Sequence, residues 1–195
     1  DFCLSRGLGD VYKRQVTKEY MRENAVFADA FNYLIYGGKK VIDPAGLTEI
    51  DTATSAVGKK DALQKYRDVL KAAVIKQDEK MSYVLLGVEN QTDVHYAMPV
   101  RNAIYDALQY GKQVSDIAAG HRRSQKDYSG KTGGEYLSGF LKEDHIKPVI
   151  TLVIHFGAEE WDGPLSLHEM MPIRDMEILS YVETVSYTHL TLPTT

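Results

Sequence analysis

The chain has 195 residues, of which 26% are charged, and its formal net charge is −4 at pH 7. An acidic total argues against a domain that is basic over its whole surface, as many nucleic-acid-binding domains are. No apolar run approaches the roughly 20 residues of a membrane-spanning helix. We therefore expect a soluble, cytoplasmic protein without a membrane partner.

Both ends of the chain resemble translated sequencing adapter. Residues 5–15, SRGLGDVYKRQ, match a transposon-type adapter, and residues 185–194, VSYTHLTLPT, match the same end read on the opposite strand. We assign 1–15 and 185–195 as non-native and expect 16–184 to form one domain, truncated at its C-terminus. The tails hold three of the 23 basic and two of the 27 acidic residues, which leaves the domain at −5. They also hold the one cysteine, which excludes disulfides and thiolate metal sites in the domain.

The first half of the domain predicts a helix, a connection and a hairpin. The sequence from residue 17 onward has apolar residues at helical spacing and ends at Gly37 and Gly38, which are typical of a helix C-terminus. Residues 41–63 are a long polar connection. Residues 65–91 contain two β-rich runs around the polar turn KQDEK, a pattern typical of a hairpin.

The second half predicts a helix over residues 96–119, with Pro99 in its first turn, and a buried strand over 147–157. A Gly-rich basic loop, 120–140, separates the two, and a loop and a final helix follow. The expected apolar face of the long helix consists of Val100, Ile104, Leu108, Val114 and Ala118. The order α, β, β, α, β, α predicts an α/β fold with a mixed sheet and helices on its faces.

The expected hairpin register brings two carboxylates together. An even-length turn centred within KQDEK places Asp68 directly opposite Glu89. Opposed residues share one face of an antiparallel pair, and Gln91 lies on the same side of the strand as Glu89. That face is otherwise apolar, so we expect the two carboxylates at the end of an apolar surface.

Like charges opposed in a sheet are destabilising. Either one carboxyl stays protonated through a raised pKa, or a cation lies between the two groups. Two carboxylates suit Mg²⁺, which leaves its other positions to water and substrate phosphate. A bulge or an odd-length turn would instead move Asp68 to the other face, and acidic residues at strand ends are often only solvated.

The same region resembles the Rpn family of recombination-promoting nucleases and putative transposases, within the PD-(D/E)XK nuclease superfamily. Several motifs carry the resemblance in order: Asp68 early in one strand, Glu89-x-Gln91 at the end of the next, and a Met-Pro-x-Arg helix start at 98–101. An apolar strand that ends in Gly157, with Trp161 after it, completes the pattern. The resemblance covers residues 20–180 and implies a restriction-endonuclease-like core in helix–hairpin–helix–strand order.

The resemblance also implies roles for individual residues. Asp68 and Glu89 would bind Mg²⁺ or Mn²⁺, Gln91 would stand where the superfamily usually has Lys, and Glu23 would be the assisting acid of the first helix. The implied reaction is metal-dependent hydrolysis of a DNA phosphodiester. The implied partner is DNA, with the chain acting either alone or as a homodimer. Gln91 departs from the superfamily's Lys, because an amide offers hydrogen bonds but no charge.

Other residues allow two interpretations each. Arg101 could contact phosphate, or it could form an ion pair with Glu89 or Asp68 that offsets their repulsion without a metal. Asp51 could replace Asp68 as a ligand, although a solvated or capping role is more typical. The basic run 121–126 is consistent either with a solvated loop or with a DNA-backbone contact. In the second interpretation the contacting residues are Arg122, Arg123 and Lys126.

Two functional hypotheses follow. The first is a Mg²⁺-dependent DNA endonuclease centred on Asp68, Glu89 and Gln91. The second is a nuclease-derived DNA-binding or interaction module that is catalytically weak or inactive. A purely structural network between Arg101 and the carboxylates is a third interpretation. His155 lies on an apolar strand, and we interpret it as a core histidine whose hydrogen bonds are satisfied.

Overall fold

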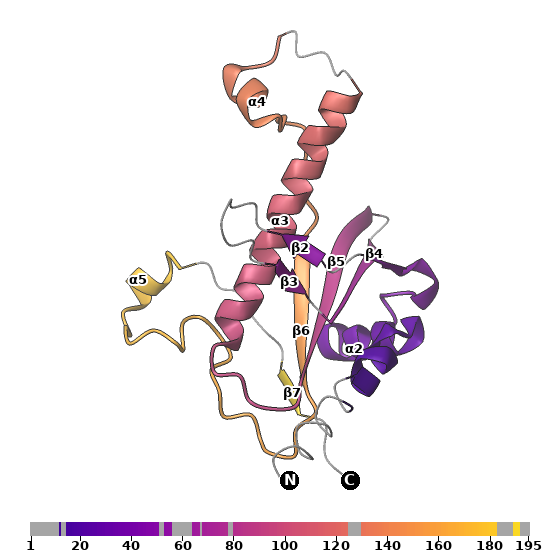
Figure 1. Ribbon diagram of the computed structural model, residues 1–195, viewed down its shortest axis with the longest axis vertical. Coiled ribbons are helices and arrows are strands. Elements are labelled where there is room, and N and C mark those ends of the chain that lie inside the picture. Colours follow the sequence, from indigo (N-terminus) through magenta and orange to yellow (C-terminus); the bar gives the residue numbers. More distant parts are fainter. Residues whose placement is uncertain are drawn as a thin grey trace.

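The structure is a computed structural model, and it describes residues 12, 15–50, 53–55, 64–66, 68–77, 80–124, 130–182 and 189–191. Its main sheet has five strands in the order β1-β4-β5-β6-β7. The flanking strands are β1 (Thr48–Glu49) and β7 (His189–Thr191), and the latter lies in the segment predicted to be non-native. A separate two-stranded sheet pairs β2 (Ala53–Ser55) with β3 (Gln64–Tyr66). Figure 1 shows helices on both sides of the main sheet.

The expected hairpin is the centre of this sheet. β4 (Val69–Gln77) and β5 (Lys80–Gln91) are antiparallel, and their register runs from Val69 opposite Val88 to Gln77 opposite Lys80. This is the register that an even-length turn predicts, so the prediction is confirmed. Residues 78 and 79, at the turn itself, lie outside the described part of the chain.

The next unit is a strand–helix–strand crossover. α3 (Met98–Arg123) follows β5, and β6 (Val149–His155) then pairs with β5 in parallel. All but one of the residues of β6 are buried, as expected for a strand covered on both faces. The carboxyl ends of β5 and β6 therefore lie side by side, close to where α3 begins.

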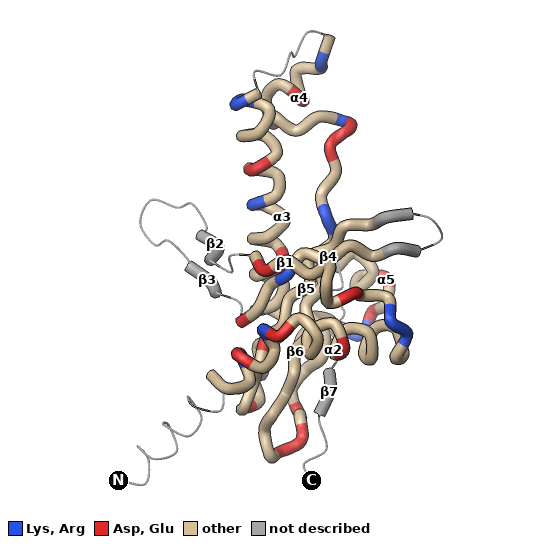
Figure 2. The backbone as a smooth tube through the Cα atoms, turned by 90° about the vertical axis from the view of Figure 1, so that its right-hand side faces the viewer, with Lys and Arg blue, Asp and Glu red and all other residues tan. Residues whose placement is uncertain are grey.

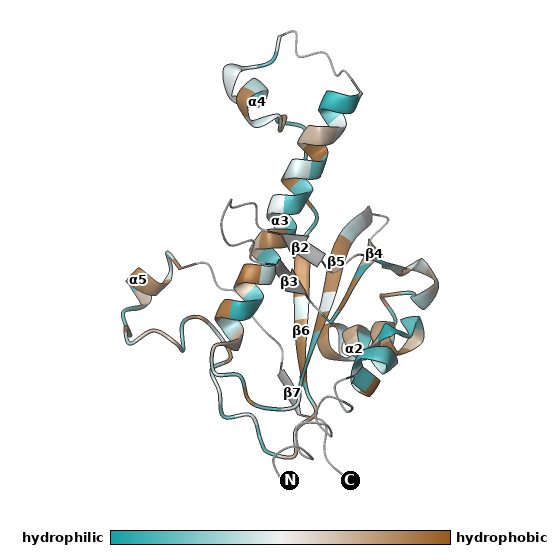
Figure 3. Ribbon diagram, viewed as in Figure 1, coloured by the Kyte–Doolittle hydropathy of each residue, from teal (hydrophilic) through white to brown (hydrophobic). Residues whose placement is uncertain are grey.

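The two faces of the sheet are different in character. α2 (Asn24–Tyr36) packs Phe27 and Phe31 on a continuous apolar cluster of β4, β5 and β6. The opposite face carries a much smaller apolar cluster, centred on Leu70, Leu85 and Val149, next to Tyr110 of α3. Figure 3 shows the alternation of hydrophilic and hydrophobic residues along α3. The large hydrophobic core thus lies on the α2 side, and the α3 side has room for polar groups.

The first helix is interrupted, contrary to the prediction of one continuous helix. Residues 15–22 are helical, Glu23 is extended with ψ 124, and α2 starts at Asn24. The carbonyl of Arg22 accepts a hydrogen bond from the ammonium group of Lys71, which also donates to Asn24 Oδ1 at 2.6 Å. This buried lysine on β4 therefore holds the break in place. The C-terminus is as predicted, with Gly37 left-handed at φ 60.

The predicted apolar face of α3 is wrong. Val100 and Val114 are exposed, and of the expected face only Ala118 is buried. The buried side of α3 is mixed instead: Asn102, Asp106 and Gln109 are buried along with Met98 and Tyr105. The reason is the chemistry of the surface beneath, where Thr151 of β6 donates a hydrogen bond to Asp106 at 2.8 Å. Polar groups on this face of the sheet therefore accept polar residues of the helix beside apolar ones.

Short elements were missed in the two predicted loops. The connection after α2 contains a 3₁₀ turn, η1 (Pro44–Gly46), and then β1, β2 and β3. The Gly-rich loop contains α4 (Gly133–Ser138), whose capping box joins Thr132 and Glu135. The final helix is reduced to a single turn, α5 (Met176–Leu179). The helix–hairpin–helix–strand order and the mixed sheet agree with the prediction.

Candidate functional site

Glu89 and Gln91 lie at the carboxyl end of β5, on the face toward α3. The Glu89 side chain is completely buried, and the Gln91 amide donates a hydrogen bond to Glu89 Oε1 at 3.2 Å. Both side chains share the face of Leu85, because alternate residues of a strand point the same way. The strand therefore carries apolar contacts for most of its length and ends in an acid and an amide.

Asp68 reaches the same place from the neighbouring strand. It lies one residue before β4, and the confirmed register, continued by one step, sets it opposite Glu89. Its Oδ2 accepts a hydrogen bond from the backbone N–H of Asn90 at 2.9 Å. This contact holds the Asp68 carboxylate against the end of β5.

Arg101 supplies the positive charge between α3 and the sheet. Its Nη2 is 2.5 Å from Glu89 Oε1, and its Nε donates to the Tyr105 hydroxyl at 3.0 Å. Burial lowers the pKa of the guanidinium, but the Glu89 carboxylate, Tyr105 and Asp68 outweigh it, so the pKa of Arg101 is raised overall. The guanidinium stays charged, and it compensates the two carboxylates in this structure.

Three of the other predicted site residues lie away from this point, and a fourth falls outside the described residues. Glu23 is exposed at the start of α2, which covers the opposite face of the sheet. Arg122 and Arg123 are exposed at the far end of α3, about 32 Å from Arg101 at 1.5 Å per residue. Lys126, like the alternative ligand Asp51, lies outside the described residues.

His155, interpreted from the sequence as a satisfied core histidine, also lies at this end of the sheet. It ends β6 and is the register partner of Gln91, so the two side chains lie on the same face of neighbouring strands. Its ring is buried, and its Nε2 is 2.9 Å from the carbonyl oxygen of Glu159. A carbonyl can only accept, so Nε2 carries the proton. In the neutral ring Nδ1 is then an acceptor, and it has no hydrogen-bond partner within the described part of the chain.

The loop after β6 holds this ring in its orientation. A Cβ added to Gly157 would lie 2.4 Å from His155 Cε1, so the glycine backbone lies directly against the ring. The ring of Trp161 meets it edge-on, with centroids 5.4 Å apart. A Gly and a Trp shortly after a buried strand that ends in His were the available sequence signal.

Asp68 and Glu89 are the carboxylates that a divalent cation would bind at this site. Mg²⁺ accepts one or two carboxylates and fills its remaining positions with water or phosphate, so Asp68 and Glu89 are a sufficient donor set. Among the described residues, no group of three or more His, Cys, Asp or Glu side chains is arranged to hold a metal. Glu89 Oε1 is also engaged by Arg101. A cation would therefore fit at Glu89 only after the Arg101 guanidinium moves away.

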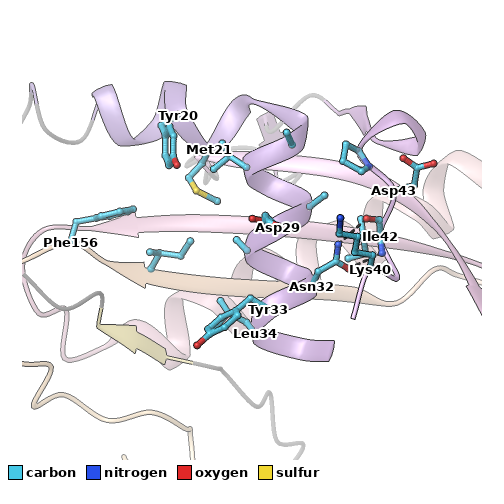
Figure 4. Close-up of a pocket in the computed structure, with 16 residues that line it drawn as sticks. Tyr20, Met21, Asp29, Asn32, Tyr33, Leu34, Lys40, Ile42, Asp43 and Phe156 are labelled. Atoms are coloured by element: carbon cyan, nitrogen blue, oxygen red, sulfur yellow. Dashed lines mark hydrogen bonds between the residues drawn. The ribbon is translucent and has the colours of Figure 1, made fainter. Parts of the chain in front are cut away.

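A second concave surface lies on the other side of the sheet. It has a volume of about 1010 Å³ and is formed by the first helices together with Ile42 and the end of β6 (Figure 4). Its lining is mainly apolar and aromatic, with Met21, Ile154 and Phe156 among its residues. It belongs to the α2 face and contains none of the carboxylates discussed above.

Comparisons with known proteins add no information about this site. No protein-family model matches the chain, and no curated protein or solved structure matches it either. Within the described residues, no helix combines the length and the apolar character of a membrane span.

Proposed function

We propose that the chain is a divalent-metal-dependent DNA endonuclease of the recombination-promoting type, with a PD-(D/E)XK-like core. The observation that carries the proposal is the meeting of Asp68 and Glu89 at one end of the hairpin, beside a charged arginine. The carboxyl ends of parallel strands are also where ligands bind in open α/β sheets.

Each residue has a chemical role in this proposal. Asp68 and Glu89 would hold Mg²⁺ or Mn²⁺, which when bound lowers the pKa of a coordinated water and polarises a phosphoryl oxygen. Arg101 is partly exposed and carries a permanent charge that can neutralise a DNA phosphate. Gln91 orients water or phosphate by hydrogen bonds, because an amide carries no charge.

A second candidate function is favoured by one observation. The ion pair of Arg101 with a completely buried Glu89 compensates the site without a metal. This arrangement suits a nuclease-derived DNA-binding or interaction module that no longer cuts. The two candidates differ in whether Mg²⁺ changes the reaction of the chain with DNA.

The test is nicking of supercoiled plasmid by the full chain, in Mg²⁺ or EDTA. Asp68→Asn and Glu89→Gln remove the proposed ligands, and Asp93→Asn is the matched control because Asp93 is exposed just beyond β5. We expect both ligand variants to lose at least about a hundred-fold in rate, with the control unchanged and all variants folded by circular dichroism. A folded wild type that binds DNA but never cuts it would replace this proposal with the binding module.

A further inference from the structure

The distal half of α3 forms an arm with α4. This arm, residues 111–124 and 130–147, projects beyond the sheet along the long axis of the molecule (Figure 1). Ala118 of α3 is buried in it, and a Cβ added to Gly139 would lie 3.0 Å from the Cβ of Ala118. The return segment, residues 139–147, therefore packs closely on the helix where it begins. The arm is therefore a packed unit with a defined surface.

The acidic groups of the arm are engaged inside it. Asp116 pairs with Lys112 and Glu143 with Lys131, each at 2.9 Å. Asp144 contacts His121 at 3.3 Å and also accepts the backbone N–H of Leu141.

Glu135 accepts the backbone N–H of Thr132 within the capping box, and its other oxygen accepts the backbone N–H of Lys142. With these carboxylates engaged, the arm has little negative charge left to present to a partner.

Exposed cations remain on the surface of the arm, and Lys147 at its base lies over the Tyr83 ring. Arg122, Arg123 and Lys142 are exposed, and none of them has an acidic partner within the described residues. Figure 2 shows the basic positions at the end of α3 and in the return segment. The chain as a whole has a net charge of −4, so free positive charge gathered at one end is a local feature. The ligand whose charge complements this surface is a polyanion.

The spacing along α3 matches a property of duplex DNA. Arg122 and Arg123 lie 21 and 22 residues after Arg101, which places them within about 60° of its direction around the helix. The same count sets them about 32 Å from Arg101. One turn of B-DNA is about 34 Å, so the backbone presents an equivalent phosphate at nearly this distance.

We propose that the arm is a second phosphate-contacting surface, and that the substrate is duplex DNA extending about one helical turn beyond the site at Arg101. This inference rests on the proposed function, in which Arg101 is the first residue to contact a DNA phosphate. A rigid helix with contacts one turn apart suits a stiff duplex, whereas single strands are bound through stacking aromatics in grooves. The arm increases the affinity for duplexes that are long enough to reach it. Its contacts are with phosphates, so they do not distinguish base sequences.

The test compares binding to two duplexes by fluorescence anisotropy, with the full chain in EDTA. A 30-bp duplex spans both contacts, and an 8-bp duplex closed by a hairpin loop is about 27 Å long and cannot. Arg122→Gln/Arg123→Gln is the test variant. Lys112→Gln is the matched control, because Lys112 lies on the same helix but already pairs with Asp116.

We expect the double variant to lose about ten-fold in affinity for the 30-bp duplex and less than about two-fold for the 8-bp duplex. The slope of log K against log salt should fall by about two for the long duplex only. Lys112→Gln should behave as wild type. Equal losses on both duplexes, or no loss on the long one, would overturn the inference.

The outcome is separable from that of the proposed function. Length-dependent binding that needs Arg122 and Arg123, in a chain that never nicks plasmid, would keep the arm and reject the endonuclease. Mg²⁺-dependent nicking by a double variant with unchanged affinity for the long duplex would reject the arm and keep the endonuclease. The thermal unfolding midpoint should fall only slightly, because both arginines are exposed and contribute mainly as cations in the last turn of α3.

Discussion

Glu89 Oε1 and Arg101 Nη2 are 2.5 Å apart, and they join the end of β5 to the first turn of α3. Glu89 is completely buried, whereas a quarter of the Arg101 side chain is exposed. The pair thus has a fixed member and a member that solvent or a ligand can reach. This asymmetry makes the arginine the group that can leave.

Arg101→Met is expected to destabilise the fold. It leaves the Glu89 carboxylate buried without its cation, which typically costs about 3–5 kcal/mol in free energy of unfolding. Adding Glu89→Gln to this variant removes the uncompensated charge and should recover at least about half of the loss. Urea unfolding of the single and double variants measures both numbers. Two additive losses would mean that the ion pair contributes nothing.

The same substitution should change how the chain responds to Mg²⁺. In the wild type a cation must displace Arg101 from Glu89, so saturating Mg²⁺ should raise the unfolding midpoint only slightly. In Arg101→Met no guanidinium competes with the cation for Glu89, and the upward shift should be several degrees larger, because binding to the folded state stabilises it. Asp68→Asn in the Arg101→Met background is the control and should abolish the extra shift. Equal shifts in wild type and Arg101→Met would contradict competition for Glu89.

The hairpin and its carboxylates could be predicted because their geometry is local. A period of two along each strand and one turn of even length decide which side chains meet, so the pairing of Val69 with Val88, and with it the place of Asp68 at the end of β5, follows from the sequence. The ion pair with Arg101 was one of two open alternatives. Its selection depends on how α3 is rotated on the sheet, and helical periodicity predicted the wrong face. His155 is buried as expected, but its place beside Gln91 depends on strand pairing between β5 and β6, which the local sequence does not show.

Lys71 shows why contacts between distant parts of the chain could not be predicted from the sequence. A lysine in a strand normally indicates a solvated face, but this one contacts Arg22 and Asn24, which lie 49 and 47 residues earlier. Nothing near Lys71 in the sequence indicates these partners. The capping box of α4 is different, because Thr132-x-x-Glu135 is a readable helix start within the predicted loop.

Lys71 should make stability rise with pH. Burial is the main influence and lowers the pKa of Lys71 below 10.5, although Glu49 raises it in part and Arg22 lowers it further. Between the folded pKa and 10.5 the unfolded chain binds more protons, so the free energy of unfolding increases with pH. Lys71→Met lacks this dependence. In urea unfolding, the free energy of unfolding of the wild type should therefore increase relative to that of Lys71→Met between pH 7 and pH 10. Lys39→Met, at an exposed lysine, is the control, and a constant difference for Lys71→Met would contradict the argument.

Glu135 should make α4 sensitive to acid. The backbone N–H of Thr132, its hydroxyl and the backbone N–H of Lys142 lower the pKa of Glu135 from 4.5 to about 2. A lowered carboxyl pKa stabilises the fold fully above pH 4.5, and this stabilisation is lost as the pH falls toward about 2. Amide hydrogen exchange in α4, corrected for intrinsic rates, should therefore speed up between pH 5 and pH 2.5. In Glu135→Gln it should be fast at both values, and acid-independent protection in the wild type would refute the role of the carboxylate.

Gly157→Ala should disturb the end of β6 more than its size suggests. The added Cβ would lie 2.4 Å from both His155 Cε1 and the carbonyl oxygen of Thr92, so the ring or the backbone after β5 must shift. Overpacking of this kind typically costs about 1–3 kcal/mol, and it should also disturb the Gln91 side chain beside His155. Gly111→Ala is the matched control, because its Cβ meets nothing within 4 Å and alanine favours the helix. Urea unfolding should show a loss for Gly157→Ala and a small gain for Gly111→Ala. A Gly157→Ala chain as stable as the wild type would mean that the histidine ring is not held by this loop.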